Sequence, residues 1–348
     1  MQVKSYRVAV PVWADADDMT EMINYELRQL GHQAAGFSYT DPVPEDIDVL
    51  LTFGPYNKII PIWAGVPLRE SRQRPVVAHW NTEGIPDLRM PYRIVRWLGS
   101  TRSWVGRLSH SHSSLSRRLS TLPPFNWVDR RMNRYRYVGD YDYAYKKGWL
   151  HILADSSQIY GAVRSRAGIP TLYVPWGGSP VLYADLNLKR DIDVLWMGKR
   201  GTKRRSVILD QVCDELRPYG VKIHVADNEQ NPFIFNGTRT EYLNRAKITL
   251  NITRTWYDDN FSRFALAAPN RSLIVSEPVL EHCSEFKANV HYVAAQIPEL
   301  SKTILYYLEH EDERERIVDR AYNLVTAELR FYHGIKRIMD AVEQVNLR

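Results

Sequence analysis

The chain has 348 residues, of which 44% are hydrophobic and 25% charged, a balance typical of a soluble globular protein with one large or two ordinary domains. Its formal net charge of +6 at pH 7 favours anionic partners such as nucleotide diphosphates, nucleic acid or anionic membranes. Two cysteines exclude a disulfide framework, and with no secretory signal or bilayer-spanning apolar run we expect a cytoplasmic protein.

Short apolar segments alternate with amphipathic ones along the first half of the chain. We predict helices over residues 15–30 and 156–167, and strands over 7–13, 48–53, 75–79, 150–154 and 171–175. Such alternation indicates an α/β domain built on a parallel sheet. Residues 89–147 interrupt the pattern with arginine, serine and aromatic residues, and we interpret them as a partly helical elaboration of the first domain.

A second set of alternating elements follows the turn-forming residues 176–180. The pattern predicts strands over 191–197, 221–225, 248–252 and 273–276, with helices over 203–217, 238–246, 304–308, 317–329 and 335–345. We therefore divide the chain into an N-terminal domain over 1–187, a C-terminal domain over 188–330 and a terminal helix over 331–348.

The strands predicted over 248–252 and 273–276 both end in polar residues. Ligands of open α/β sheets bind beyond the carboxyl ends of the strands, so we expect these residues to share one crevice. In this interpretation arginines clamp a diphosphate, aspartates accept hydrogen bonds from sugar hydroxyls and a glutamate holds the ribose. The alternative is a set of surface salt bridges. The candidates are Thr253, Arg254, Asp258, Asp259, Asn260, Arg263 and Glu277.

A basic loop over residues 198–205 follows one predicted strand and opens a helix. Backbone N–H groups and the positive end of a helix favour a phosphate at such a place, and the candidates here are Lys199, Arg200 and Lys203. The spacing matches neither a Walker A loop nor GxGxxG. A solvated helix start is the alternative interpretation.

Candidate catalytic residues follow two strands of the first half. His79 and Glu83 lie at one strand end, where an imidazole and a carboxylate can serve as acid and base or bind a sugar. Asp15 and Asp17 follow the first strand, and one of them is a candidate base for an acceptor hydroxyl. A structural histidine and helix-capping aspartates are the alternatives. No metal-binding spacing occurs, so we expect no metal site.

Four segments together resemble GT-B glycosyltransferases of the group 1 type, near their CgeB-like branch. The first combines residues 154–157, 168–170 and 174–177, and the others cover 191–198, 241–251 and 263–277. The resemblance implies two Rossmann-like domains facing across an interdomain cleft, with the terminal helix packing back on the N-terminal domain. It further implies a nucleoside-diphosphate sugar in the C-terminal domain, a glycan, lipid-linked or polymeric hydroxyl acceptor in the N-terminal domain, and no metal or cofactor.

One position departs from the family pattern. Group 1 enzymes commonly show two glutamates about eight residues apart, which would fall here at Asp258 or Asp259 and at Ala265. An alanine cannot bind ribose. Either Glu277 takes over this role, the donor is held differently, or the chain is a catalytically inactive GT-B binding subunit.

The basic aromatic segment leaves further partners open. Residues 96–147 hold eleven Lys or Arg against three Asp, together with many Trp and Tyr. This composition suits a protein peripheral to an anionic membrane surface. It also fits phosphate contacts and base stacking, as in a nucleic-acid-modifying glycosyltransferase or a nucleic-acid binder.

Overall fold

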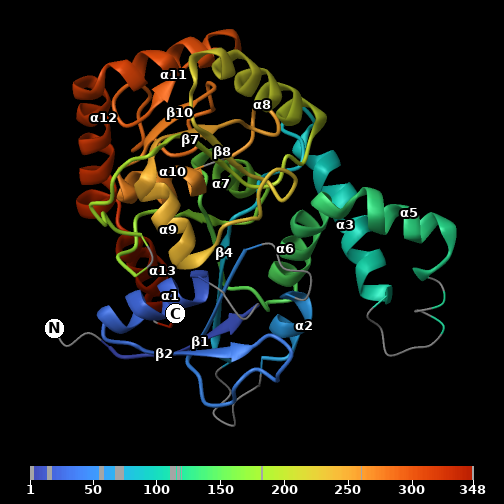
Figure 1. The fold of residues 1–348 in the computed structure, drawn as a ribbon. Helices are drawn as coiled ribbons and strands as arrows, with labels where there is room; N and C mark the ends of the chain where they lie inside the picture. Colours follow the sequence, from blue (N-terminus) through green and yellow to red (C-terminus); the bar gives the residue numbers. More distant parts are fainter. Residues whose placement is uncertain are drawn as a thin grey trace. The chain divides into compact units, whose positions relative to one another are not determined.

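The structure is a computed structural model, and it describes residues 4–13, 18–54, 59–66, 74–109, 115, 118, 120–181, 183–259 and 261–346. Contacts divide the chain into two compact units (Figure 1). Unit 1 comprises residues 1–15, 27–174 and 337–348, and unit 2 comprises 16–26 and 175–336. Helices α1 (Asp18–Gln29) and α13 (Phe331–Asn346) contribute residues to both units.

Unit 1 is built on a parallel sheet whose described strands run in the order β2-β1-β3-β4-β5-β6. Every residue of β3 and β4 is buried, as expected for strands covered by helices on both faces. Helices α2 and α6 pack on one face, where Trp63 and Tyr141 join the core. The strands are β1 (Arg7–Val12), β2 (Gln33–Ser38), β3 (Val49–Phe53), β4 (Val76–Asn81), β5 (Ile152–Asp155) and β6 (Thr171–Tyr173), and the helices are α2 (Ile59–Ala64), α3 (Tyr92–Ser109), α5 (Pro123–Arg131), α6 (Arg136–Lys146) and α7 (Gln158–Arg166).

Unit 2 contains a second parallel sheet, with the described strand order β11-β10-β9-β7-β8. Helices α8, α11 and α12 cover one face, and α9 and α10 cover the other, so apolar residues on both faces of each strand are buried. The strands are β7 (Ile192–Met197), β8 (Ile223–Ala226), β9 (Ala246–Asn251), β10 (Leu273–Ser276) and β11 (Val293–Ala294), and the helices are α8 (Lys203–Leu216), α9 (Asn236–Arg245), α10 (Phe261–Ala267), α11 (Leu300–Glu309) and α12 (Glu311–Asn323).

In both sheets the first strand in the sequence lies in the interior, and later strands are added on both sides of it. The chain passes from β1 to β2 at one edge and then returns to β3 on the opposite side of β1, and β7, β8 and β9 repeat the same path. This arrangement is doubly wound. It confirms the α/β fold with parallel sheets that the alternating pattern predicted, and the Rossmann-like domains that the resemblance implied. It places a topological switch point between β1 and β3 and another between β7 and β9.

Candidate functional site

The switch point of unit 2 lies beyond the carboxyl ends of β7 and β9. Open α/β sheets bind nucleotides at such a switch point, beyond the loops that leave the two neighbouring strands. The loop after β7 begins at Gly198, and the loop after β9 contains Thr253 and Arg254. The sequence prediction placed the candidate site at this edge.

Gly198 brings the loop after β7 close to a guanidinium group. Its φ of 116° is a backbone conformation that side chains with a Cβ rarely adopt. A Cβ on Gly198 would also lie 3.0 Å from Nη2 of Arg263. The loop then enters α8, where the Thr202 hydroxyl accepts a hydrogen bond from the backbone N–H of Arg205 at 3.2 Å. A helix start leaves further backbone N–H groups without intrahelical acceptors, and such groups favour an anion.

Arg263 reaches from α10 to the carboxyl end of β9. Its Nη1 donates to the Asn251 side-chain oxygen at 3.1 Å and to the Ile252 carbonyl at 3.3 Å, and its guanidinium lies 5.5 Å from the centre of the Trp196 ring. These contacts leave Nη2 directed at the Gly198 backbone. The guanidinium is therefore fixed beside the loop that an anion would approach.

Arg204 and Glu277 form an ion pair at the same edge. The Arg204 Nη1 atom donates to Glu277 Oε1 at 3.0 Å and to the Thr253 carbonyl at 2.8 Å, and Nη2 also bonds Glu277. Glu277 Oε1 further accepts from the backbone N–H and the hydroxyl of Thr253, at 2.6 and 2.8 Å. Glu277 is only 3% exposed. Its carboxylate thus holds Arg204 and the loop after β9, and this arrangement favours a positioning role over the predicted contact with ribose.

A second carboxylate binds two more arginines. Arg254 forms a two-pronged contact with Asp258, from Nε at 2.8 Å and Nη2 at 3.0 Å, and its backbone N–H donates to the same group at 3.2 Å. Arg205, which is 5% exposed, lies 4.0 Å from Asp258 and donates to the Lys199 carbonyl at 3.0 Å. Asp258 therefore holds two arginines in place, and its predicted contact with sugar hydroxyls stays a prediction.

The site carries more positive than negative charge. Four guanidinium groups, those of Arg204, Arg205, Arg254 and Arg263, surround the two carboxylates of Asp258 and Glu277. Burial, and after it the charge of Arg205, lowers the pKa of Arg263 to about 9, and burial together with Arg254 lowers the pKa of Arg205 to about 10. Both guanidinium groups stay charged at neutral pH. Burial and mutual repulsion therefore destabilise the charged cluster, and a bound anion would relieve this.

The remaining donor candidates lie apart from this cluster or outside the description. Arg200 binds Asp227 at 2.7 Å and Asp210 at 2.6 Å. Burial lowers the pKa of Arg200, but these two hydrogen bonds outweigh it and raise the pKa. We therefore infer that Arg200 supports the loop. Lys199 and Lys203 are exposed. Asp259 is half-buried and contributes to the electrostatic environment of His282. Asn260 lies outside the described residues.

Two residues of the cluster were missed in the sequence. Arg204 and Arg205 stand in the same basic run as Lys199, Arg200 and Lys203, and composition does not separate them. The signal that could have found them is helical phase: Thr202 caps α8, so residues 204 and 205 occupy its first turn. Arg205 and the apolar Ile208 and Leu209 are buried on one face of that helix.

The N-terminal catalytic candidates have different outcomes. Asp15 and Asp17 lie outside the described residues. His79 is fully buried, with Nδ1 3.0 Å from the Thr52 hydroxyl and Nε2 2.9 Å from the Tyr141 hydroxyl. Burial, with the charge of Arg164, lowers its pKa to about 3, so it is neutral at physiological pH. This environment favours the structural alternative for His79.

The backbone of Glu83 belongs to the same hydrogen-bond network as His79 and Tyr141. The Tyr141 hydroxyl donates to the Asn81 side chain at 2.8 Å, and Asn81 donates to Asp155 at 2.8 Å and to the Glu83 carbonyl at 2.7 Å. Asp155 pairs with the buried Arg164. The backbone of Glu83 thus closes a chain of hydrogen bonds across β3, β4 and β5, while its side chain is half-buried.

The basic aromatic segment is less cationic at its surface than its composition indicates. All three of its aspartates hold arginine or lysine: Asp129 binds Arg102, Asp140 binds Arg136, and Asp142 binds both Arg96 and Lys146. Arg107 lies 3.8 Å from the centre of the Tyr143 ring. Several cations therefore stabilise the packing of α3, α5 and α6. Exposed arginines remain at 118, 130, 131 and 134, and exposed tryptophans at 97, 104 and 127.

Among the described residues, no helix combines the length and hydropathy required to cross a bilayer. The same part of the chain holds no group of three or more His, Cys, Asp or Glu side chains that could bind a metal ion.

Comparisons with known proteins agree with this geometry. Residues 204–340 match a protein family described as glycosyl transferase-like, and this range contains all the residues of the arginine cluster. No curated protein has a significant match to the sequence.

Solved structures resemble the chain over nearly its full length at very low identity. Sucrose-phosphate synthase from Thermosynechococcus elongatus has 10% identity and a TM-score of 0.60, with 99% of this chain and 100% of that chain covered. Anabaena HepE, solved with UDP and glucose, has 8% identity and a TM-score of 0.55 over 99% of this chain and 100% of that chain. S. aureus TarM has 9% identity and a TM-score of 0.52 over 84% of this chain and 55% of that chain. The chain therefore has the GT-B fold, and its residues 204–340 are similar to the glycosyl transferase-like family.

Proposed function

We propose that this protein is a glycosyltransferase that takes its sugar from a nucleoside-diphosphate sugar. The observation that carries the proposal is the surplus of guanidinium charge at the switch point of unit 2, where four arginines face two carboxylates. A diphosphate supplies the missing negative charge, and planar guanidinium groups match phosphate oxygens in two-pronged contacts. HepE, a structural relative, has been solved with UDP-glucose and with UDP and glucose.

In the reaction, an acceptor hydroxyl attacks C1 of the donor sugar while the bond from C1 to the β-phosphate oxygen breaks. The hydroxyl proton passes to a base, and the nucleoside diphosphate leaves with the additional negative charge. Arg263 and the first turn of α8 are placed to stabilise that charge without reorganisation. Metal independence belongs to this proposal, since these cations perform the neutralisation that a divalent metal performs elsewhere.

The acceptor side stays a set of predictions. We propose that unit 1 binds the acceptor, with Asp15 or Asp17 as the base that removes the hydroxyl proton. The sequence predicts three kinds of partner here: a sugar or lipid-linked acceptor, an anionic membrane surface, and nucleic acid. Membership of the CgeB-like branch is likewise a prediction. Because His79 is buried and neutral, we remove it from the acid-base candidates.

Ala265 supports a second candidate function, that of a catalytically inactive binding subunit. The residue is 2% exposed on α10, two positions beyond Arg263, and the resemblance to group 1 enzymes implies a glutamate at this position. Glu277, the predicted substitute, is already engaged by Arg204 and Thr253. An inactive binding subunit would hold the diphosphate through its arginines and transfer no sugar.

A thermal-shift screen with UDP, GDP, ADP, CMP and their sugars tests both candidates. A ligand at a hundredfold excess over its Kd stabilises the native state by about 2.7 kcal/mol. We expect one nucleoside diphosphate to raise the Tm, and its sugar to be hydrolysed slowly in the absence of an acceptor. Stabilisation without hydrolysis or transfer would favour the inactive subunit, and no shift with any nucleotide would refute the proposed donor site.

A further inference from the structure

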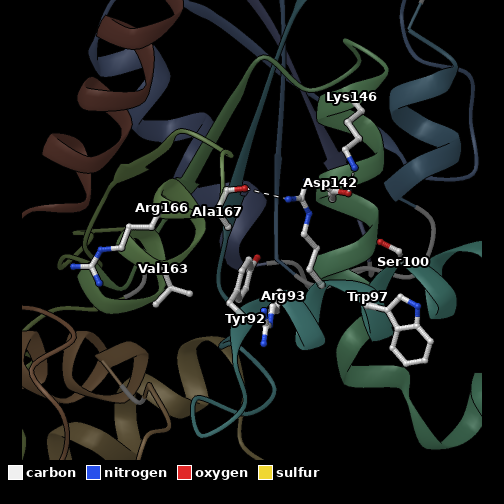
Figure 2. A pocket seen from close by; sticks show the side chains of 10 residues that line it. Tyr92, Arg93, Trp97, Ser100, Asp142, Lys146, Val163, Arg166 and Ala167 are labelled. Carbon is white, nitrogen blue, oxygen red and sulfur yellow. Dashed lines mark hydrogen bonds and ion pairs between the residues drawn. The ribbon is translucent and has the colours of Figure 1, made fainter.

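A pocket of about 600 Å³ lies in unit 1, between α3, α6 and α7 (Figure 2). Its volume is in the range of sites that bind small molecules. Arg96 crosses from α3 to the carbonyl of Ala167 at 3.2 Å, which ties α3 to the end of α7. The lining residues comprise cations, two aromatic rings and small or apolar groups: Tyr92, Arg93, Arg96, Trp97, Ser100, Asp142, Lys146, Val163, Arg166 and Ala167.

The pocket has an excess of positive charge. Its lining holds four cationic side chains and a single carboxylate, that of Asp142. Asp142 pairs with Arg96 and accepts a hydrogen bond from Lys146 at 2.7 Å. Arg93 and Arg166 are exposed, and neither has a hydrogen-bond or ion-pair partner among the described residues. Two guanidinium groups are thus available at the rim to bind an anion.

Apolar surface accompanies these cations. Trp97 is 66% exposed at the pocket, and Tyr92 and Val163 add further apolar atoms (Figure 2). An aromatic face suits a ligand with an apolar ring face and polar edges, whereas a small inorganic anion would not use it. A sugar ring has that form, because its C–H groups gather on one face and its hydroxyls lie at the edge.

The pocket is separate from the edge where α/β sheets bind nucleotides. Helix α6 ends at Lys146 shortly before β5 starts, and α7 ends at Arg166 shortly before β6 starts. Lys146, Arg166 and Ala167 therefore lie toward the amino ends of these strands, opposite the carboxyl-end crevice. The walls are held by close helix contact, since a Cβ on Gly139 of α6 would lie 1.9 Å from the Gly99 carbonyl of α3.

We infer that this pocket binds a saccharide unit that bears a carboxylate or phosphate group, as part of an acidic glycan. Arg93 and Arg166 bind the anionic group, and Trp97 packs against the sugar ring. The inference rests on the proposed function in that it names the chemistry of the acceptor. Binding at the pocket needs no donor, so the two ideas fail separately.

Calorimetric titration and tryptophan fluorescence with defined oligosaccharides test the inference. Hexagalacturonate and glucose 6-phosphate present the carboxylate and the phosphate, and maltohexaose is the neutral control. We expect an acidic ligand to bind and maltohexaose not to bind. The double variant Arg93→Ala/Arg166→Ala should lose at least about tenfold in affinity, the lower limit for one lost charge-assisted contact. Trp97→Ala should lose both affinity and the fluorescence change.

Matched controls decide whether the pocket or general charge is responsible. Arg130→Ala/Arg131→Ala removes two exposed arginines from α5 that do not line the pocket, and it should bind hexagalacturonate like the unmodified protein. An equal loss in this control would overturn the inference, as would the absence of binding to either acidic ligand. Retention by phosphatidylglycerol vesicles that the pocket variants abolish, without saccharide binding, would assign the pocket to a lipid headgroup instead.

Nucleotide binding separates the inference from the proposed function. Arg93→Ala/Arg166→Ala should bind nucleoside diphosphate normally, and Arg263→Ala should bind hexagalacturonate normally. If the unmodified protein binds hexagalacturonate but no nucleotide, the proposed donor site is wrong and the inference stands. If it binds nucleotide but no acidic saccharide, the reverse holds.

Discussion

Replacement of Arg263 by alanine tests the donor site most directly. The guanidinium is fixed by Asn251 and Ile252 at the end of β9 and lies against Gly198, so it is positioned before any ligand binds. A hydrogen bond to a charged group contributes about 1.5 to 3 kcal/mol, and losing it corresponds to a roughly 10- to 150-fold rise in Kd. The variant also removes repulsion from Arg205, so we expect the stability of the free protein to change much less than ligand affinity.

The assay is a thermal shift at a fixed nucleotide concentration, a hundredfold above the Kd of the unmodified protein. Stabilisation by the ligand should fall from about 2.7 kcal/mol to roughly 0.3–1.3 kcal/mol in the variant, a decrease of about 2 to 3 °C in the ligand-induced Tm shift. Arg263→Lys keeps the charge but loses the planar fork, and should fall between the two.

Arg245 offers a matched control for this experiment. It pairs with Asp191 at 2.8 Å, immediately before β7, and so lies at the opposite edge of the same sheet. Arg245→Ala should lower stability slightly and leave the nucleotide-induced shift unchanged. If Arg263→Ala binds nucleotide as tightly as the unmodified protein, the diphosphate does not occupy the arginine cluster and the reasoning fails.

Three further outcomes follow from the structure. Gly198→Ala should lower the Tm more than Gly31→Ala, because both glycines have positive φ but only a Cβ at 198 meets a neighbouring guanidinium; equal losses would show that this contact is unimportant. Glu277→Gln should weaken binding of nucleoside diphosphate and inorganic pyrophosphate alike, since the carboxylate holds an arginine, and selective loss of the nucleoside diphosphate in isothermal titration would instead restore its contact with ribose. Between pH 6.5 and about 3 the unfolded chain protonates His79 while the native protein does not, so native stability falls on acidification. In denaturant titrations at pH 6 and 5, His79→Gln should reduce that fall by roughly 1.4 kcal/mol per pH unit, and an unchanged fall would contradict the buried, neutral state of His79.

Elements with apolar cores were predictable from their patterns, and elements without them were not. The strand expected over 273–276 was found at those residues, because its buried Leu, Ile and Val form an unbroken apolar run. β2 was missed since it is an edge strand whose residues, Gln33–Ser38, are exposed or half-buried. Its strand conformation depends on parallel pairing with β1, which local composition does not reveal.

Local sequence pattern was enough to predict the end of the sheet at which the candidate site lies. Polar residues after β9 and β10, and a glycine followed by basic residues after β7, mark the carboxyl ends of neighbouring strands, because the apolar runs that define the strands stop there. Local pattern also identified Arg254 and Arg263, since they stand directly after a strand and in the first turn of a helix.

Which charges are available to a ligand depends on contacts between residues that are distant in the sequence. Arg200 forms an ion pair with Asp227, which is 27 positions away in the sequence, and Arg204 forms one with Glu277, which is 73 positions away. Such pairs form where β7, β8, β9 and β10 are brought side by side, and no local pattern specifies them. A guanidinium group has the same intrinsic chemistry in both cases, and its role is set by the carboxylates and phosphates that the fold places within its reach.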